Sequence, residues 1–191
     1  MNPTLERLIG RALRGVRAGD RHLAWNAPAL AGLPDGIALD SPAFAAQAAL
    51  PLRYAGIGVG DNLSPPLRWS GVPAASAELV LVIEDPDAPL PRPVVHALAT
   101  GIPPRWQGLP EGALALPAEG PIRLGRGFLG RRGYAGPRPV RGHGAHRYVF
   151  QIIAVDRPLV LAEPAGLAAV LAALAGHALA KGRLIGTFER P

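Results

Sequence analysis

Proline and glycine interrupt this chain so often that long helices are excluded from most of it. The 191 residues include 24 glycines and 22 prolines, which favour turns. From residue 37 onward, short apolar runs alternate with Gly, Pro, Asp and Asn, a pattern typical of strands joined by loops. The runs are IALDS, LPLRY, LRWS, ELVLVIE, VVHALAT, PIRL and RYVFQIIAVD. We therefore expect a mainly β chain that folds as a β-sandwich.

Two segments near the C-terminus complete the expected fold. In residues 148–155 both alternating sets of side chains are mostly apolar, which predicts a central strand with both faces covered. Residues 164–181 repeat apolar side chains at helical spacing, and RLIGTFE follows them as a final strand. Strands first and a helix late favour an all-β or α+β domain over repeating βαβ units.

The first 36 residues differ from the rest. Within residues 4–17 the apolar side chains share one helical stripe, with arginines elsewhere around it, which predicts a short amphipathic helix. Such a helix could lie on an anionic membrane, but we favour docking on its own domain or on a partner subunit. The Ala-, Pro- and Gly-rich segment 19–36 is interpreted as a linker. The chain is therefore divided into an extension over 1–36 and a domain over 37–191.

Composition excludes several classes of protein. Hydrophobic residues make up 49% and charged residues 18%, which is too apolar for disorder, yet no apolar run approaches the roughly 20 residues that cross a bilayer. The chain has no Cys and shows no signal peptide, which predicts a cytoplasmic protein. Its net charge of +6 comes mostly from scattered arginines, and aromatics are only 5%, so we do not expect nucleic-acid binding.

The stretch IEDPDAPLPRPVVH carries the first candidate for chemistry. Its prolines exclude a helix, so Asp85 and Asp87 should stand at the end of a strand. They could form a functional pair or merely an Asx-turn that satisfies backbone N–H groups. His96 shares parity with Val94 and Leu98, which places it on a half-buried face of the next strand. A core histidine hydrogen-bonded to a carbonyl group is the alternative there.

A second candidate is the loop from Gly125 to Tyr148, which is dense in Gly, Pro and Arg. Its first six residues match the dinucleotide fingerprint GxGxxG, but the glycines and prolines that follow forbid the helix this fingerprint needs, so we reject it. The N–H groups of such a loop can line an anion site, although an ordinary flexible loop is the alternative. His143, His146 and His96 with an Asp make a weak zinc ligand set, and we expect no metal and no cofactor.

Three ordered segments together resemble those of a known family. DNLSPPLRW (61–69), DPDAP (85–89) followed by His96, and GYAGPRPVRGHGAHRYVF (133–150) are similar, in order and spacing, to signature segments of the phosphatidylethanolamine-binding protein family. SPAF at 41–44 and the final GRLIGTFER look like its bacterial, Raf kinase inhibitor-like branch. The resemblance covers about residue 37 to the C-terminus and leaves residues 1–36 unmatched.

The resemblance implies a Greek-key β-sandwich with a small pocket for phosphate, acetate-like anions or phospholipid headgroups. A phosphate in this pocket would accept hydrogen bonds from protonated imidazoles and loop N–H groups, while a carboxylate would meet the ammonium of ethanolamine. Carried over position by position, the ligand-binding residues would be Asp85, Asp87, His96, Tyr134, Gly136, Pro137, His146, Arg147 and Tyr148.

Three positions depart from the family's pattern. Ala97 stands where Trp is common, Val140 where a second proline is common, and Phe188 where Tyr is often seen. We therefore expect a pocket that is wider or drier than usual.

The leading functional interpretation is a non-catalytic binding protein for a small anion or phospholipid headgroup. The resemblance also implies regulation of a partner protein such as a kinase or protease. One alternative is a hydrolase that uses Asp85 or Asp87 with His96 or His146 as an acid–base pair, although no activated Ser is evident. The other is an interaction protein, for example a homodimer, that assembles through the N-terminal helix.

Overall fold

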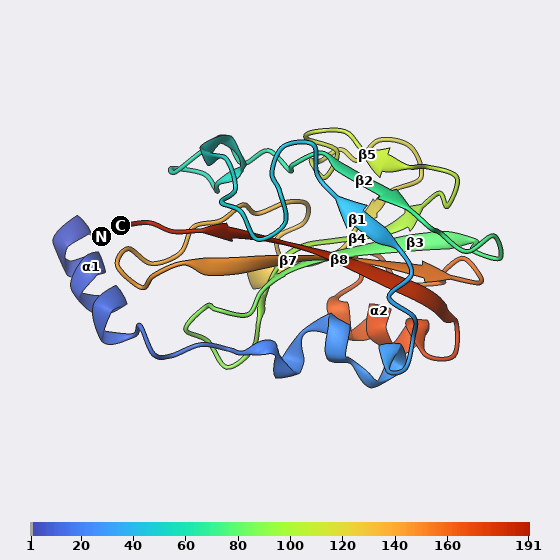
Figure 1. The fold of residues 1–191 in the computed structure, drawn as a ribbon, viewed down its shortest axis with the longest axis horizontal. Coiled ribbons are helices and arrows are strands. Elements are labelled where there is room, and N and C mark those ends of the chain that lie inside the picture. The colour runs from blue at the N-terminus through green and yellow to red at the C-terminus, as the bar shows by residue number, and fades with distance from the viewer. Residues whose placement is uncertain (1) are drawn as a thin grey trace.

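The predicted strands form two antiparallel sheets (Figure 1). The computed structural model describes residues 2–191. The larger sheet has the order β6-β4-β3-β7-β8 and the smaller sheet the order β1-β2-β5. The larger sheet consists of β3 (Glu78–Asp85), β4 (Val94–Ile102), β6 (Arg123–Leu124), β7 (His146–Val155) and β8 (Ala178–Phe188). The smaller sheet consists of β1 (Ala38–Asp40), β2 (Leu67–Ser70) and β5 (Gly108–Leu109).

The larger sheet has a Greek-key order. β3, β4 and β6 follow one another across it, and a long connection then brings the chain back to β7 on the other side of β3. The main core lies between the two sheets, where Leu39 and Trp69 of the smaller sheet join Phe150 and Ile152 of the larger one. The predicted β-sandwich is therefore confirmed, as is the internal strand over 148–155, which pairs with β3 on one side and β8 on the other.

A second core covers the opposite face of the larger sheet. Helix α2 (Leu167–Leu174) packs Val170 and Leu174 with Val82 and Ile153 of the sheet. The helix is shorter than the one expected over 164–181, because the chain turns at Gly176, which has a φ of 76°, and β8 begins at Ala178. The final strand is correspondingly longer than predicted.

Two other segments form short 3-10 helices: one was expected to be a strand, and the other was expected to be a loop. The run LPLRY contains η4 (Leu52–Tyr54) rather than a strand. The Gly-rich loop contains η5 (Phe128–Gly130), and no α-helix follows the GxGxxG match before β7 begins.

Residues 19–36 do not form the free linker that their composition predicts. They contain three 3-10 helices, η1 (Asp20–His22), η2 (Ala24–Asn26) and η3 (Pro28–Leu30), and cover the second face of the larger sheet beside α2 (Figure 1). Leu30 is fully buried there. The Ala24 N–H donates to the carboxylate of Glu84 on β3 at 2.8 Å, and the Lys181 ammonium of β8 lies 4.3 Å from the ring centre of Trp25. The segment is therefore part of the packed domain.

The N-terminal helix α1 (Pro3–Ala12) docks through its polar side. Asn2 caps it by accepting a hydrogen bond from the Thr4 N–H at 2.9 Å. Glu6 faces the domain and binds Arg190 at 2.8 Å, and Gly10 is buried against the backbone of Arg141. The helix is shorter than the expected 4–17, and Met1 of the predicted extension lies outside the described residues.

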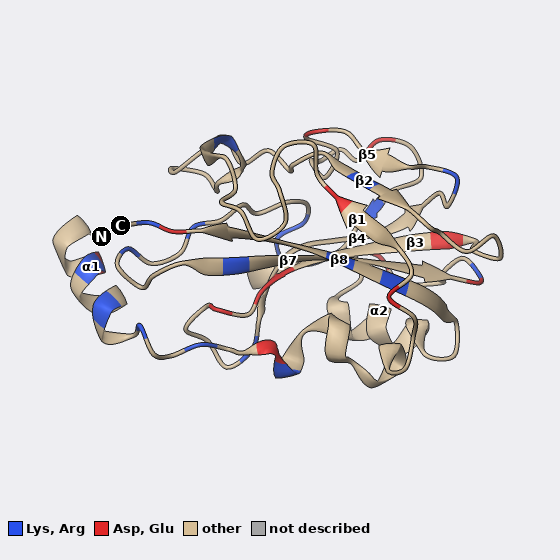
Figure 2. Ribbon diagram, viewed as in Figure 1, with Lys and Arg blue, Asp and Glu red and all other residues tan. Residues whose placement is uncertain are grey.

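The apolar side of α1 faces solvent. Leu5, Leu8 and Ile9 are exposed by 51%, 58% and 37%. Helix α1 packs at one end of the sandwich, close to the C-terminus of the chain (Figure 1). Basic residues are spread along the whole ribbon rather than gathered in one segment (Figure 2). Among residues 2–191, no helix is both long enough and apolar enough to cross a membrane.

Candidate functional site

Asp85 ends β3 and closes a turn with one oxygen while binding a histidine with the other. Its Oδ1 accepts hydrogen bonds from the backbone N–H groups of Asp87 at 2.7 Å and Ala88 at 3.1 Å, which is an Asx-turn. Its Oδ2 lies 2.7 Å from Nδ1 of His146, at the start of β7. The Asx-turn considered for the DPD sequence is thus formed by one oxygen of Asp85, and the other oxygen is left to contact His146.

A β-bulge turns His96 toward the space between the sheets. The register of β3 and β4 shifts at this point, where Ile83 pairs with Ala97 and Glu84 with Val95. His96 is the extra residue, and such a residue redirects its side chain. Its ring packs edge-on against Tyr148 at 5.0 Å between ring centres, whereas Leu98 packs in the other core. The predicted shared parity of His96 and Leu98 is therefore wrong, because the bulge breaks the alternation.

His96 and Tyr148 each present one buried polar atom that has no protein partner. The Nδ1 atom of His96 is hydrogen-bonded to the Ala135 carbonyl oxygen, so Nδ1 carries the proton and Nε2 is left free. The hydroxyl of Tyr148 is also unpartnered, although this side chain is only 1% exposed. Burial lowers the pKa of His96 and raises the pKa of Tyr148, so the free protein holds a neutral imidazole and a neutral phenol.

These side chains line a cavity of about 380 Å³. Asp85, His96, His146 and Tyr148 form its polar part, together with Asn62 and the backbone of Gly136. Exposed apolar and basic side chains also line it, namely Ile57, Leu90, Phe128, Leu129, Arg131 and Arg138. A ligand in this cavity would meet buried hydrogen-bonding groups as well as exposed apolar surface and arginines.

His146 has a partner at each ring nitrogen. Nδ1 faces Asp85, and Nε2 lies 2.7 Å from Nδ1 of His143. The Nε2 atom of His143 in turn lies 3.1 Å from the backbone carbonyl oxygen of Val16. His146 therefore lines the cavity with its ring but has no free N–H group for a ligand.

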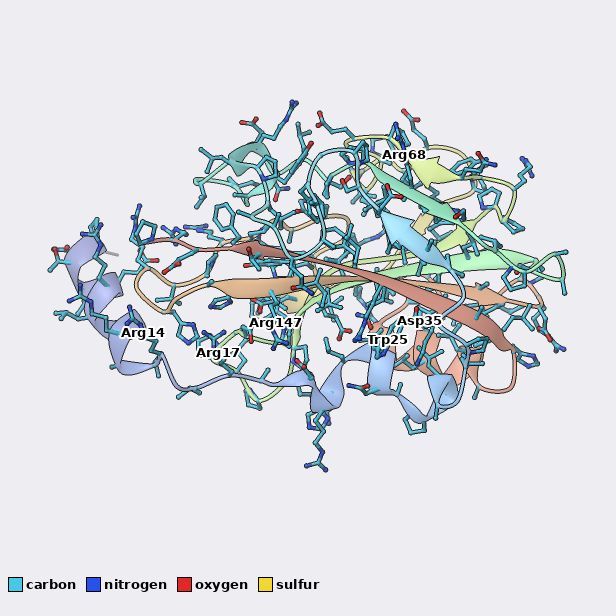
Figure 3. All side chains as sticks on the ribbon, in the orientation of Figure 1. Arg14, Arg17, Trp25, Asp35, Arg68 and Arg147 are labelled. Atoms are coloured by element: carbon cyan, nitrogen blue, oxygen red, sulfur yellow. The ribbon has the colours of Figure 1, made fainter. Side chains whose placement is uncertain are left out.

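Asp87 and Arg147 form an ion pair that does not line the cavity. The guanidinium of Arg147 donates to both oxygens of Asp87, at 2.8 and 2.9 Å, and Arg17 adds a contact at 3.1 Å. Figure 3 shows Arg17 and Arg147 beside each other. Burial alone would raise the pKa of Asp87, but the hydrogen bonds from Arg147 and Arg17 outweigh it and hold the pKa below its ordinary value. This pair fastens the DPD turn to β7.

Tyr134 and Pro137 support the wall of the cavity from outside it. The Tyr134 hydroxyl donates to the carbonyl oxygen of Tyr54 at 2.9 Å, and Pro137 is also buried. Gly136 donates its N–H to the Asn62 side chain at 2.8 Å, and a β-carbon at Gly136 would overlap the Tyr54 carbonyl oxygen. Of the predicted site residues, five line the cavity: Asp85, His96, Gly136, His146 and Tyr148.

A metal does not fit between the histidines. Their facing nitrogens are 2.7 Å apart, a hydrogen-bond distance, whereas a zinc ion needs about 2 Å to each nitrogen. Within residues 2–191, no three His, Cys, Asp or Glu side chains converge as a possible metal site.

The sequence model of one family, described as phosphatidylethanolamine-binding protein, matches residues 40–189. The chain belongs to the phosphatidylethanolamine-binding protein family. Its sequence relatives include a Pyrococcus abyssi UPF0098 protein, 39% identical over 147 residues that cover 74% of this chain and 79% of the relative. A protein of Mycobacterium tuberculosis named "Putative lipoprotein LppC" is 42% identical over 164 residues, covering 85% of this chain and 76% of the relative.

Solved structures of the phosphatidylethanolamine-binding protein family share the fold. The homologue CT736 of Chlamydia trachomatis is 32% identical and superposes with a TM-score of 0.73, covering 82% of this chain and 99% of that structure. YbcL of Escherichia coli, at 24% identity, has a TM-score of 0.76 with the same two coverages. The family match leaves α1 and residues 13–39 outside it.

Two features of this family member were not visible in its sequence. The Asn62 side chain holds Gly136, and the Ala135 carbonyl oxygen holds His96. Neither residue was predicted as a site residue, although Asn62 lies in the family segment DNLSPPLRW.

Of the three departures from the family's pattern, Val140 lines the cavity, whereas Ala97 and Phe188 pack in the core between the sheets. The expectation of a wider pocket stays a prediction.

Proposed function

We propose that the chain is a non-catalytic binding protein whose cavity takes a small anion, such as phosphate or the phosphate of a phospholipid headgroup. The observation that carries this proposal is the pair of unpartnered buried atoms, His96 Nε2 and the Tyr148 hydroxyl, which belong to two residues that line one cavity. Buried polar atoms without a hydrogen-bond partner are rare in proteins and reduce stability. A ligand that hydrogen-bonds to both atoms would therefore gain binding free energy.

The two free atoms have complementary requirements. A neutral His96 accepts a hydrogen bond at Nε2, whereas the Tyr148 hydroxyl can donate one. A singly ionised phosphate, which carries two protons, supplies both a donor and acceptors to these atoms, whereas a doubly ionised phosphate would instead draw a proton onto His96. In either case binding favours one additional proton, so phosphate affinity should rise as the pH falls from 8 to 6.

The outer part of the cavity favours an ester over the bare anion. Apolar side chains such as Phe128 and Leu90 lie there with Arg131 and Arg138. Arginine pairs well with phosphate oxygens, and the apolar surface would be covered by the organic part of a phosphate ester. We therefore infer a phosphate ester as the ligand class.

Isothermal titration of the protein with phosphate and phosphoethanolamine at low salt tests this function. We expect saturable binding that survives chelator treatment and weakens about tenfold in Tyr148→Phe, which corresponds to about 1.4 kcal/mol. Tyr134→Phe is the matched control, since its hydroxyl bonds to Tyr54 outside the cavity. Equal affinity in both variants, or no binding to the unmodified protein, would refute the proposal.

No observation favours the hydrolase alternative. A general acid–base pair needs a group free to exchange a proton with a substrate. His146 has both nitrogens engaged, and Asp85 already accepts three hydrogen bonds. Asp87 is held by Arg147 and Arg17 and does not line the cavity, so the free Nε2 of His96 has no free carboxylate to complete a pair. Regulation of a kinase or protease and the cytoplasmic location stay predictions, to be tested by capture of a partner and by cell fractionation.

A second candidate function is self-association through α1. Its exposed Leu5, Leu8 and Ile9 form an apolar face that a second copy could cover. We expect a dimer by sedimentation that dissociates in Leu8→Glu while phosphate binding is retained. A monomer at all concentrations would remove this candidate.

A further inference from the structure

Residues 13–19, here called the strap, run from α1 across the turn that carries the predicted site. The backbone N–H groups of Ala18 and Gly19 donate to the carbonyl oxygens of Ala88 and Pro86, at 3.0 and 2.7 Å. Arg17 contacts Asp87 at 3.1 Å and donates to the Ala145 carbonyl oxygen, also at 3.1 Å. The strap therefore bridges the DPD turn and the start of β7, although it lies outside the residues that match the family.

The strap also ends a chain of hydrogen bonds that begins in the cavity. The chain runs from Asp85 through His146 and His143 to the carbonyl oxygen of Val16, with distances of 2.7, 2.7 and 3.1 Å. Asp85, His143 and His146 are all buried, so water does not compete for these bonds.

The two ends of this chain determine where its protons are. A carbonyl oxygen only accepts, so the Nε2 of His143 must carry a proton. Burial and the neighbouring His146 lower the pKa of His143, which keeps it neutral and leaves its Nδ1 as an acceptor. His146 must then donate from Nε2.

The other nitrogen of His146 faces the carboxylate of Asp85. Oδ1 of Asp85 accepts two backbone N–H groups, so Oδ1 carries no proton. If Oδ2 also accepts, then Nδ1 of His146, which lies 2.7 Å away, is the donor. His146 would then carry two protons and one positive charge.

The surrounding groups agree with this placement of charge. His143 is faced by His146, by Arg17 and by the backbone carbonyls of Leu13 and Val16, so a second cation at His143 would lie beside another one. His146 has the carboxylate of Asp85 beside it, and it also interacts electrostatically with neutral His96.

We propose that His143, held by the Val16 carbonyl of the strap, is a positioning residue that keeps His146 doubly protonated and thereby neutralises Asp85 in the wall of the anion cavity. This inference rests on the proposed anion binding. Without the charge on His146, the buried Asp85 carboxylate would repel an incoming phosphate. The N-terminal segment thus completes the cavity without touching its ligand.

Two substitutions of His143 separate this role from simple packing. His143→Phe keeps the ring but removes the acceptor for His146. His143→Gln offers an amide oxygen to His146 and an amide N–H group to Val16. If His143 only fills space, the phenylalanine variant should bind phosphate at least as well as the glutamine variant.

The test combines nitrogen-15 NMR of the histidine rings with phosphate titration at pH 7.5. We expect both nitrogens of His146 to be protonated in the ligand-free protein and in His143→Gln, and one to be deprotonated in His143→Phe. Phosphate affinity should fall about tenfold or more in His143→Phe and recover in His143→Gln.

The outcomes separate this inference from the proposed function. A singly protonated His146 in the unmodified protein would overturn the inference, as would unchanged affinity in His143→Phe. Absence of phosphate binding to the unmodified protein would overturn the proposed function, while the His146 spectra would still decide whether His143 and the strap fix its protons.

Discussion

Asp85 serves two neighbours with its two carboxylate oxygens, and this division explains how a turn residue can belong to a binding cavity. One oxygen holds the turn, and the other holds His146. His96 and Tyr148 are then the side chains left with free atoms for a ligand. The chemistry of the cavity thus depends on which polar atoms the protein itself leaves unused.

The buried histidines predict a loss of stability in acid. Burial lowers the pKa of His96 and of His143, so below pH about 6.5 the unfolded chain takes up protons that the folded protein does not. The free energy of unfolding should therefore fall as the pH decreases from about 6.5 toward the lowered values. Urea unfolding between pH 7.5 and 5 measures this dependence.

His96→Gln is the matched variant for the acid effect, since its amide can still donate to Ala135 but does not titrate. Its unfolding free energy should depend less steeply on pH than that of the unmodified protein. Identical slopes would show that His96 does not contribute.

At the scale of single residues, sequence predicted the position of Asp85 but not the direction of His96. The prolines beside the acids fix a turn at a strand end through local sterics alone. The bulge at His96 depends on how β3 and β4 pair, which the sequence of β4 by itself does not contain.

At the scale of elements, α1 and the strap pack against the end of the sandwich that carries the candidate site. Helix α1 approaches closely because Gly10 has no side chain, and a β-carbon there would overlap the Arg141 carbonyl oxygen. Glu6 adds an ion pair with Arg190. In α1 the polar side faces the domain and the apolar side faces solvent. The apolar stripe in the sequence could not predict this, since periodicity does not tell which face of a helix is buried.

Gly10→Ala should release α1 from the domain. The added methyl group overlaps Arg141, so trypsin should cleave faster after Arg11 and Arg14 while the melting temperature of the sandwich stays nearly unchanged. Gly15→Ala is the control, because nothing lies within 4 Å of its added β-carbon. Equal cleavage rates in both variants would contradict the close-contact account.

At the scale of the whole molecule, residues 19–36 close the second face of the larger sheet. Composition predicted a linker there, but Leu30 and Ala24 are buried with α2 against that sheet. The reason is that short 3-10 helices rich in Ala and Pro have no periodic signal, although they can cover an apolar surface.

Leu30→Ala should destabilise the protein by about 2–5 kcal/mol, because it leaves a cavity in the second core. Leu52→Ala, at a side chain that is 62% exposed, should change stability by less than about 0.5 kcal/mol. Denaturant unfolding followed by fluorescence measures both. A negligible effect of Leu30→Ala would restore the linker interpretation and the domain boundary at residue 37.

The most direct test of anion binding is nitrogen-15 NMR of His96 during a phosphate titration at pH 6.5. If the cavity binds the anion as proposed, the Nε2 resonance of His96 should move strongly and saturate, because this atom gains its missing hydrogen-bond partner, while Nδ1 stays bound to Ala135. An Nε2 resonance that does not respond, whether or not phosphate binds elsewhere, would contradict the assignment of this cavity as the anion site.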